Sequence, residues 1–184
     1  MHKEQIEYCK SVKKLHPGHF VGKGVLDAGS LDINGSNRYL FNNCTYFGVD
    51  IAKGPNVSAQ CLIHELPNHF HTVPEFDTII STNTFEHDKY WRQSIPALIT
   101  MLRPGGLLLF VCSHDHPEHG TVNAHPRRSP TSRIEGWEDY YRNLSKEDIR
   151  DILNLDEIFA EYEMGYSEDG RDLQFWGVKK VNHE

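Results

Sequence analysis

Residues 112–120, CSHDHPEHG, place three histidines within six positions: His114, His116 and His119. A cluster of imidazoles this dense is compatible with four roles: proton transfer near neutral pH, contact with a substrate, binding of a transition metal, or exposure to solvent. A zinc site needs three or four converging ligands, and side-chain alternation along an extended segment sends His114 and His116 apart. The sequence therefore disfavours a metal here, although His125 could join the cluster through folding of the loop, and it leaves proton transfer, substrate contact and a solvated loop open.

These histidines follow the last of five short runs that are apolar along most of their length. Such runs are typical of strands buried on both faces of a parallel sheet, and they lie at 24–29, 45–51, 56–62, 76–82 and 106–113. Helical spacing predicts helices at 3–15 and 88–102, with weaker candidates at 35–42 and 64–71. Pro96 lies inside the 88–102 helix and predicts a kink or a break there.

The end of the chain has a different pattern. SKED at 145–148 predicts an N-cap that opens a helix to about residue 155. Residues 158–180 predict an antiparallel hairpin that turns at Asp169 and Gly170. Alternating strands and helices followed by this hairpin predict an α/β sandwich. Ligands of such sheets bind at the carboxyl ends of the strands, so the histidines should lie near the loops after residues 29, 50, 62 and 82.

Composition narrows the class of protein. A chain of 184 residues with 38% hydrophobic residues predicts one domain over 1–184, and no run of about 18 apolar residues suggests a membrane span. The formal charge of -7 disfavours duplex nucleic acid as a partner. The first residues lack the apolar core of a signal peptide, and the four cysteines form no CxxC pair. These features predict a cytoplasmic location.

The loop after the first expected strand, VLDAGSLDINGS at 25–36, could bring backbone N–H groups close to a ligand. Leu31 and Asn34 occupy the places where a dinucleotide fingerprint needs glycine, and no P-loop lysine follows. Asp27 near the end of this strand could hold a cationic amino group or ordered water. Asp50 at the end of the next strand could accept both hydroxyls of a ribose. Both acids could instead cap their turns.

The order of several segments resembles the class I S-adenosylmethionine-dependent methyltransferases, within the group called methyltransferase type 11. The resemblance covers about residues 24–113 and rests on VLDAGSLDINGS, GVDI, FDTIISTNTFEHD and MLRPGGLLLFV. It implies a Rossmann-like three-layer sandwich with a mostly parallel seven-stranded sheet and an antiparallel C-terminal hairpin. It also implies S-adenosylmethionine as cofactor and S-adenosylhomocysteine as product. The implied cofactor-binding residues are Asp27, Gly29, Ser30, Leu31, Gly35, Asp50, Ile51, Leu62, Ile63, His64 and Asn83.

Two departures from that family pattern bear on cofactor binding. The glycine loop is stretched, because SLDIN separates Gly29 from Gly35 and would place Leu31 and Asp32 over the methionine end of the cofactor. The acid that many relatives offer to the adenine amino group is replaced by apolar residues at 62 and 63. Adenine would then contact apolar side chains and backbone groups at 62–64.

The resemblance implies a methyltransferase that acts on a small-molecule acceptor by O- or N-methylation. His114 is the leading candidate for the proton acceptor, His119 the second and His87 a further one, whereas Glu86 beside it is expected to be structural. Residues 1–18 should form a lid or packing helix, and residues 114–143 should cover the substrate. The residues expected to contact substrate are His116, Trp137, Tyr140 and Tyr141.

Two other functions remain open at this point. One is a lyase that binds the same cofactor and breaks it down without an acceptor, and the other is a non-catalytic binding or interaction module on the same fold. No residue identifies the acceptor or the oligomeric state.

Overall fold

Seven strands form one mixed sheet in the computed structural model, which describes residues 2–70 and 75–181. The strands are β1 (Gly24–Ala28), β2 (Thr45–Asp50), β3 (Ala59–Gln60), β4 (Phe76–Thr82), β5 (Leu102–Ser113), β6 (Phe159–Tyr166) and β7 (Asp172–Lys179). Their order across the sheet is β3-β2-β1-β4-β5-β7-β6. The first five strands pair in parallel, and β7 lies antiparallel to both β5 and β6. The predicted seven-stranded sheet with its antiparallel C-terminal hairpin is confirmed.

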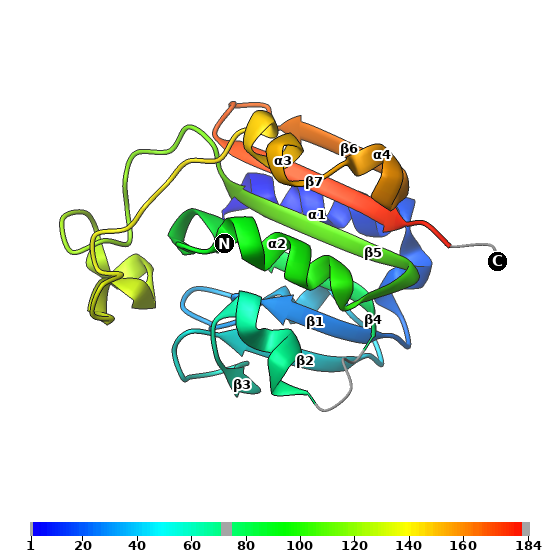
Figure 1. The fold of residues 1–184 in the computed structure, drawn as a ribbon, viewed down its shortest axis with the longest axis horizontal. Helices are drawn as coiled ribbons and strands as arrows, with labels where there is room; N and C mark the ends of the chain where they lie inside the picture. Colours follow the sequence, from blue (N-terminus) through cyan, green and yellow to red (C-terminus); the bar gives the residue numbers. More distant parts are fainter. Residues whose placement is uncertain (1, 71–74, 182–184) are drawn as a thin grey trace.

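Helices cover both faces of this sheet (Figure 1). Helix α1 (Lys3–Leu15) lies on one face, and α2 (Trp91–Thr100), α3 (Lys146–Ile152) and α4 (Leu155–Ile158) lie on the other. Strand β5 is apolar along most of its length because its successive side chains point to opposite faces of the sheet and helices cover both faces. Leu107 and Leu109 belong to the core cluster that contains Cys9 of α1, whereas Leu108 and Phe110 belong to the cluster that contains α2. Both faces of the strand are therefore buried.

Several predicted elements differ from those observed. The helices expected at 35–42 and 64–71 are short 3₁₀ helices, Asn37–Leu40 and Ile63–His69, and Pro67 inside the second removes a helical hydrogen bond. The strand expected at 56–62 shrinks to β3. The helix expected from 145 to about 155 divides into α3 and α4.

Helix α2 runs through Pro96 without the break that was one of the two predicted outcomes, and a kink at Pro96 stays a prediction. Proline removes only one hydrogen bond within the helix, while Ile95 and Leu98 on its buried face are 0% exposed. Packing of that apolar face outweighs the local preference of proline.

Two local signals at the end of the chain are confirmed. The Ser145 hydroxyl accepts a hydrogen bond from the Asp148 N–H, and the Asp148 carboxylate accepts one from the Ser145 N–H, which is a complete capping box. The hairpin turns at Gly170, whose N–H donates to the Ser167 carbonyl at 2.8 Å and whose φ is +75°. Glycine adopts this conformation without steric cost.

The carboxyl ends of β1, β2, β4 and β5 meet at one edge of the sheet, and residues 114–143 extend beyond that edge, at the left of Figure 1. The segment contains two 3₁₀ helices, Pro126–Arg128 and Pro130–Arg133. In the described ranges, no helix combines the length and the apolar character needed to cross a membrane.

Candidate functional site

A cavity of about 550 Å³ lies at this carboxyl edge. It is lined by the loops that follow β1 to β5, by the start of the chain and by the segment 114–143. Its volume is typical of a pocket for a drug-sized ligand. The residues expected to bind the cofactor that line it are Asp27, Gly29, Ser30, Leu31, Gly35, Asp50, Ile51, Leu62, Ile63 and Asn83.

The loop after β1 is held in place by backbone hydrogen bonds. The N–H groups of Gly29 and Ser30 donate to the Val49 carbonyl at 2.8 and 3.0 Å. Gly29 has a φ of +81°, and a Cβ atom there would overlap the side chain of Thr84 in the loop after β4. Only glycine allows these two loops to approach so closely. The turn is therefore rigid and presents its backbone to the cavity.

The stretched part of this loop has its own turn. The Asp32 carboxylate accepts a hydrogen bond from the Gly35 N–H at 2.8 Å and is not among the residues that line the cavity. Leu31 does line it, as expected, but Asp32 closes the local turn instead of reaching a ligand.

Asp50 connects the loops after β1 and β2. Its two carboxylate oxygens accept hydrogen bonds from the Leu31 N–H at 3.1 Å and the Ala52 N–H at 2.9 Å. Burial raises the pKa of the Asp50 carboxyl above its usual range, and the backbone N–H groups oppose that shift. A carboxylate oxygen accepts more than one hydrogen bond, so Asp50 can still accept the hydroxyls of a ligand at the cavity wall.

Asp27 is fully buried beneath the same loop. Its carboxylate accepts hydrogen bonds from the Tyr46 hydroxyl and from the Asn37 side-chain amide, the latter at 3.3 Å. Burial raises its pKa to about 6, although both donors act against the shift. At neutral pH Asp27 therefore places a negative charge at the cavity wall.

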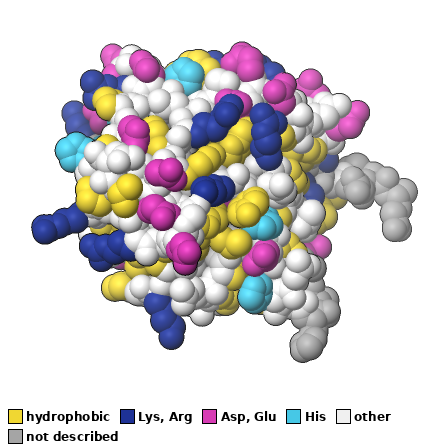
Figure 2. All heavy atoms as spheres, turned by 60° about the vertical axis from the view of Figure 1, so that its left-hand side comes forward, with side chains coloured by type: hydrophobic (Ala, Val, Ile, Leu, Met, Phe, Trp, Pro, Cys, Tyr) yellow, Lys and Arg dark blue, Asp and Glu magenta, His cyan; other side chains and the backbone are white. Residues whose placement is uncertain are grey.

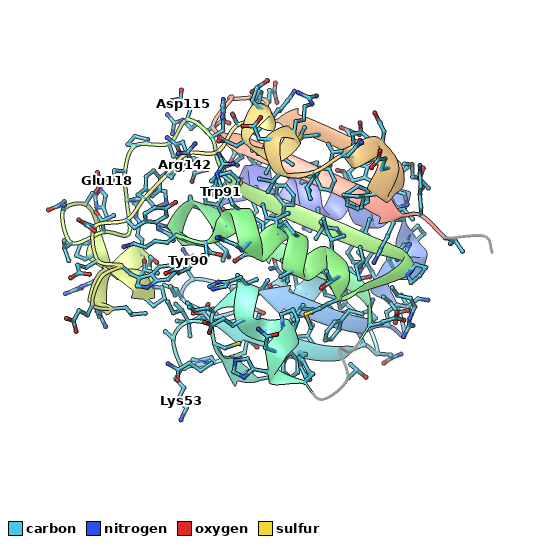
Figure 3. The ribbon with its side chains drawn as sticks, viewed as in Figure 1. Lys53, Tyr90, Trp91, Asp115, Glu118 and Arg142 are labelled. Atoms are coloured by element: carbon cyan, nitrogen blue, oxygen red, sulfur yellow. The ribbon has the colours of Figure 1, made fainter. Side chains whose placement is uncertain are left out.

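The loop after β3 provides apolar surface. Leu62 and Ile63 line the cavity, together with Ile51 from the loop after β2. His64 was expected to take part in binding here, but it does not line the cavity, and its ring instead lies 4.4 Å from the ring of Tyr90. Figure 3 shows Tyr90 at the start of α2.

The loop after β4 and the segment 114–143 form the other end of the cavity, defined here as the acceptor end. His87, His116, His119 and Trp137 line it, as the sequence predicted. Asn83 also lines the cavity, and its side-chain amide donates to the Gln5 carbonyl oxygen of α1 at 2.8 Å. The rings of His87 and His119 meet edge to face, with centroids 5.3 Å apart.

His87 and His119 are neutral at physiological pH because burial lowers the pKa of each imidazole. Burial lowers the pKa of His87 to about 3, and the neighbouring His119 adds to this effect. Burial also lowers the pKa of His119. A neutral imidazole has one nitrogen lone pair, which can accept a proton or bind a metal.

Besides His64, three expected site residues lie outside the cavity lining. His114, the leading candidate for the proton acceptor, has its Nδ1 2.7 Å from the Leu144 carbonyl, and its ring stacks on Tyr166 at 4.0 Å. Tyr140 faces Lys89, whose Nζ lies 5.9 Å from the ring centroid. Tyr141 packs behind the acceptor end against the ring of His119 at 4.9 Å. These positions do not fit the roles that the sequence suggested for them.

Other residues line the cavity without having been predicted. Several come from segments with no local binding pattern, such as the chain start and the turn of the terminal hairpin: His2, Glu4, Thr82, Thr84, Glu86, Arg128, Ser129, Thr131, Asp169 and Arg171. The only signal for the loop residues was their position after β4 and β5. The chain start and the hairpin turn reach this edge of the sheet only through long-range packing within the fold.

The neighbourhood of the acceptor end is also tied to α2. Arg142 lies beside Trp91, with its guanidinium carbon 5.6 Å from the ring centroid, as Figure 3 shows. The backbone N–H of Arg142 donates to the Glu86 carbonyl at 2.9 Å. Lys53, by contrast, points away from the molecule (Figure 3).

No protein-family model matches the sequence, and no curated protein matches it either. Solved structures do match. The 1,6-didemethyltoxoflavin-N1-methyltransferase of Burkholderia thailandensis, solved with 1,6-didemethyltoxoflavin and S-adenosylhomocysteine, aligns with a TM-score of 0.63 and 13% identity over 96% of this chain and 79% of that chain. The N-methyltransferase NodS of Bradyrhizobium japonicum aligns with a TM-score of 0.58 and 19% identity over 97% of each chain.

An arsenic(III) S-adenosylmethionine methyltransferase of Chlamydomonas reinhardtii aligns with a TM-score of 0.55 and 16% identity over the whole of this chain and 76% of that chain. These similarities establish the fold: the chain has the Rossmann-like fold of class I methyltransferases. At such low identity a shared fold does not fix the chemistry of the site.

Proposed function

We propose that the protein is an S-adenosylmethionine-dependent methyltransferase that methylates a small molecule on oxygen or nitrogen. One observation carries this proposal: the glycine turn after β1 and Asp50 at the end of β2 lie together on the wall of one cavity. In the solved neighbour from Burkholderia thailandensis, the same fold was crystallised with S-adenosylhomocysteine and a small acceptor.

The charges of the cavity lining fit those of S-adenosylmethionine, and the end of the cavity formed by the loops after β1, β2 and β3 is called the cofactor end. Six carboxyl side chains and two arginines line the cavity, and the carboxyl groups belong to Glu4, Asp27, Asp50, Glu86, Asp88 and Asp169. The sulfonium and amino groups of the cofactor are cationic, so this lining attracts them. Asp50 would accept the ribose hydroxyls, and Asp27 would hold the amino group directly or through water.

Apolar residues of the cavity fit the adenine ring. Ile51, Leu62 and Ile63 provide the contact surface, and the backbone at 62 and 63 would contact the polar edge of the ring in place of the missing acid. When bound, S-adenosylmethionine supplies an electrophilic methyl group on a sulfonium that leaves as a neutral thioether. The protein must then mainly align the acceptor with that methyl group, which contributes up to about 7–11 kcal/mol.

The acceptor end fits the activation of a weak nucleophile. His87, whose pKa burial lowers to about 3, is too weak a base to take a proton from an acceptor and would only contact it. His119 is neutral at physiological pH, so it offers a lone pair to an acceptor that must lose a proton. Such a base contributes about 10²–10⁴-fold to the rate. Trp137 offers an apolar wall beside them. We do not extend the proposal to His114, because its ring contacts Leu144 and Tyr166 instead of the cavity.

Size and charge favour a small acceptor. A cavity of about 550 Å³ that also accommodates a cofactor leaves room for a metabolite-sized partner. On the face that Figure 2 shows, Lys and Arg side chains are interspersed with Asp and Glu side chains and form no continuous basic patch. That distribution supports a small acceptor over a nucleic acid backbone.

Calorimetric titration with S-adenosylmethionine and with S-adenosylhomocysteine tests the proposal, with mass spectrometry of the S-adenosylmethionine sample afterwards. We expect binding of both ligands at micromolar concentration, intact cofactor, and transfer of labelled methyl groups to a member of a library of hydroxyl and amine metabolites. Breakdown of the cofactor without an acceptor would indicate the lyase instead. Absence of binding to either ligand would indicate the non-catalytic module.

A further inference from the structure

Three potential metal ligands converge at the acceptor end. Glu86 and His87 lie in the 3₁₀ turn Phe85–His87 after β4, and His119 lies in the segment after β5. Each offers one ligand atom, and these atoms lie within 4.8 Å of one another. All three residues line the cavity.

Two buried polar atoms in this group lack a hydrogen-bond partner. Glu86 is 0% exposed, and its Oε2 atom has no partner, while its Oε1 atom accepts the Ser113 hydroxyl at 3.2 Å. His87 is 7% exposed, and its Nδ1 atom is also buried without a partner. A buried polar group without a hydrogen-bond partner destabilises the folded protein. A bound cation would remove this destabilisation at the carboxylate and convert the imidazole into a ligand.

The surroundings orient the ligands. Nδ1 of His119 lies 3.0 Å from the Pro117 carbonyl, which can only accept a hydrogen bond. The proton of the neutral ring therefore sits on Nδ1, and the lone pair of Nε2 is free to bind a metal. This pattern, in which the second ring nitrogen donates to a carbonyl, is usual for metal-binding histidines.

A glycine brings the segment close to the other histidine. Gly120 has a φ of +71°, and a Cβ atom at this position would lie 2.7 Å from Cε1 of the His87 ring. Glycine therefore allows the backbone beside His119 to pack directly on His87.

We propose that Glu86, His87 and His119 bind one divalent transition-metal ion, with zinc as the best fit, and leave a coordination position open to the cavity. Two imidazoles and a carboxylate form the three-ligand set of many catalytic zinc sites. Imidazole ligands disfavour Mg²⁺ and Ca²⁺, which prefer oxygen. Ligand atoms around a tetrahedral zinc stand about 3.3 Å apart, so the segment that carries His119 moves in by no more than about 1.5 Å.

A metal at this place would change how the acceptor is activated. This step rests on the proposed function, whereas metal binding itself does not. An acceptor oxygen or nitrogen in the open position would lose its proton more readily, because the metal stabilises the anion. His87 and His119 would then act as metal ligands and not as proton acceptors.

A second group of potential ligands, His2, His116 and Asp172, is less suited to a cation. The nearest ring nitrogens of His116 and His2 already lie 3.1 and 3.4 Å from the two carboxylate oxygens of Asp172. The carboxylate is therefore satisfied within the protein.

The test is a titration of tag-free, chelator-treated protein with Zn²⁺ against a competing dye, together with the visible spectrum of the Co²⁺-loaded protein. We expect one Zn²⁺ per chain with a Kd below about 1 µM, and at least a 10-fold weaker Kd in Glu86→Gln and in His119→Ala. His114→Asn, a histidine substitution in the same segment but outside the cavity, is the matched control and should change the Kd by less than about threefold.

Several results would overturn the proposal. Wild-type binding weaker than about 100 µM removes the site. A Kd unchanged in both Glu86→Gln and His119→Ala shows that zinc binds elsewhere, and a loss in His116→Ala equal to that in His119→Ala assigns it to the second group. Glu86→Gln replaces a buried acid with an amide of the same size, and a cooperative melt without metal confirms that this variant is folded.

A separate titration with S-adenosylhomocysteine, with and without Zn²⁺, distinguishes the two proposals. Cofactor binding without zinc binding overturns the metal site alone. Zinc binding without cofactor binding overturns the proposed function alone.

Discussion

Replacement of Asp50 by asparagine tests the cofactor end most directly. The two Asp50 oxygens accept the Leu31 and Ala52 N–H groups and, in our proposal, both ribose hydroxyls. A hydrogen bond to a charged acceptor contributes about 1.5–3 kcal/mol and one to a neutral acceptor about 0.5–1.5 kcal/mol. Loss of charge at two hydroxyl contacts therefore costs about 2–3 kcal/mol, and the Kd for S-adenosylhomocysteine should rise about 30- to 150-fold.

The assay is isothermal titration calorimetry well below the melting temperature, because the amide also leaves one backbone N–H without an acceptor and lowers stability by about 1–3 kcal/mol. Asp32→Asn is the matched control. It removes the same charge from the neighbouring loop after β1, but Asp32 does not line the cavity, so the Kd for S-adenosylhomocysteine should change by less than about threefold.

Two results would refute the ribose assignment. One is a folded Asp50→Asn variant whose Kd for S-adenosylhomocysteine stays within twofold of the wild type. The other is an equal loss of affinity in Asp32→Asn, which would show that the effect comes from the net charge near the cavity and not from contact with the ligand.

Three further predictions concern other positions. Gly29→Ala should have a lower melting temperature than Gly22→Ala and should lose affinity for S-adenosylhomocysteine. Both glycines have a positive φ, but of the two only Gly29 has neighbouring atoms that a Cβ atom would meet. Equal melting temperatures of the two variants would contradict this reasoning. Burial raises the pKa of Asp27 to about 6, so the folded state holds a proton that the unfolded state loses above pH 4. In urea titrations, the unfolding free energy of the wild type should therefore fall by up to about 3 kcal/mol between pH 4 and 7, relative to that of Asp27→Asn. A difference between the two proteins that stays constant over this pH range would exclude the raised pKa of Asp27. Ser145→Ala should lower the unfolding free energy by about 1 kcal/mol and leave the calorimetric Kd for S-adenosylhomocysteine unchanged. An unchanged unfolding free energy would show that the capping box does not stabilise the protein.

The sequence brings the residues proposed to bind the cofactor to one edge of the sheet, because local rules specify their positions. Asp27 and Asp50 each lie at or near the end of an apolar run, and parallel strands must bring such ends to one edge. Gly29 follows the first run directly, and its positive φ is the conformation that glycine in a turn indicates. No long-range contact had to be known for these residues to be placed together.

The acceptor end was harder to predict because long-range pairing decides which side chains face the cavity. Alternation correctly indicated that His114 and His116 point apart, but it could not say which of them faces the site. The N–H groups of His114 and Asp115 donate to the Arg171 carbonyl in the terminal hairpin, and this pairing turns His114 toward Tyr166. Arg171 lies more than fifty residues further along the chain.

Glu86 shows a related difficulty. A lone acid at the start of a turn gave no sign of a ligand, and its role depends on His119, which comes from a different loop. The convergence exists only because Gly120 allows the segment after β5 to pack on His87.

The two ends of the cavity also differ in how firmly they are built, and this difference has a functional meaning. The cofactor end is fixed by hydrogen bonds from Gly29, Ser30 and Leu31 to β2 and to Asp50. The acceptor end depends on an irregular segment, 114–143, that lies beyond the edge of the sheet (Figure 1). An irregular segment changes its sequence and shape at little cost to the core, whereas the strand ends cannot. In our proposal, the chemistry of the acceptor is therefore set by that segment and the histidine it brings to His87, and not by the sheet that the chain shares with its structural neighbours.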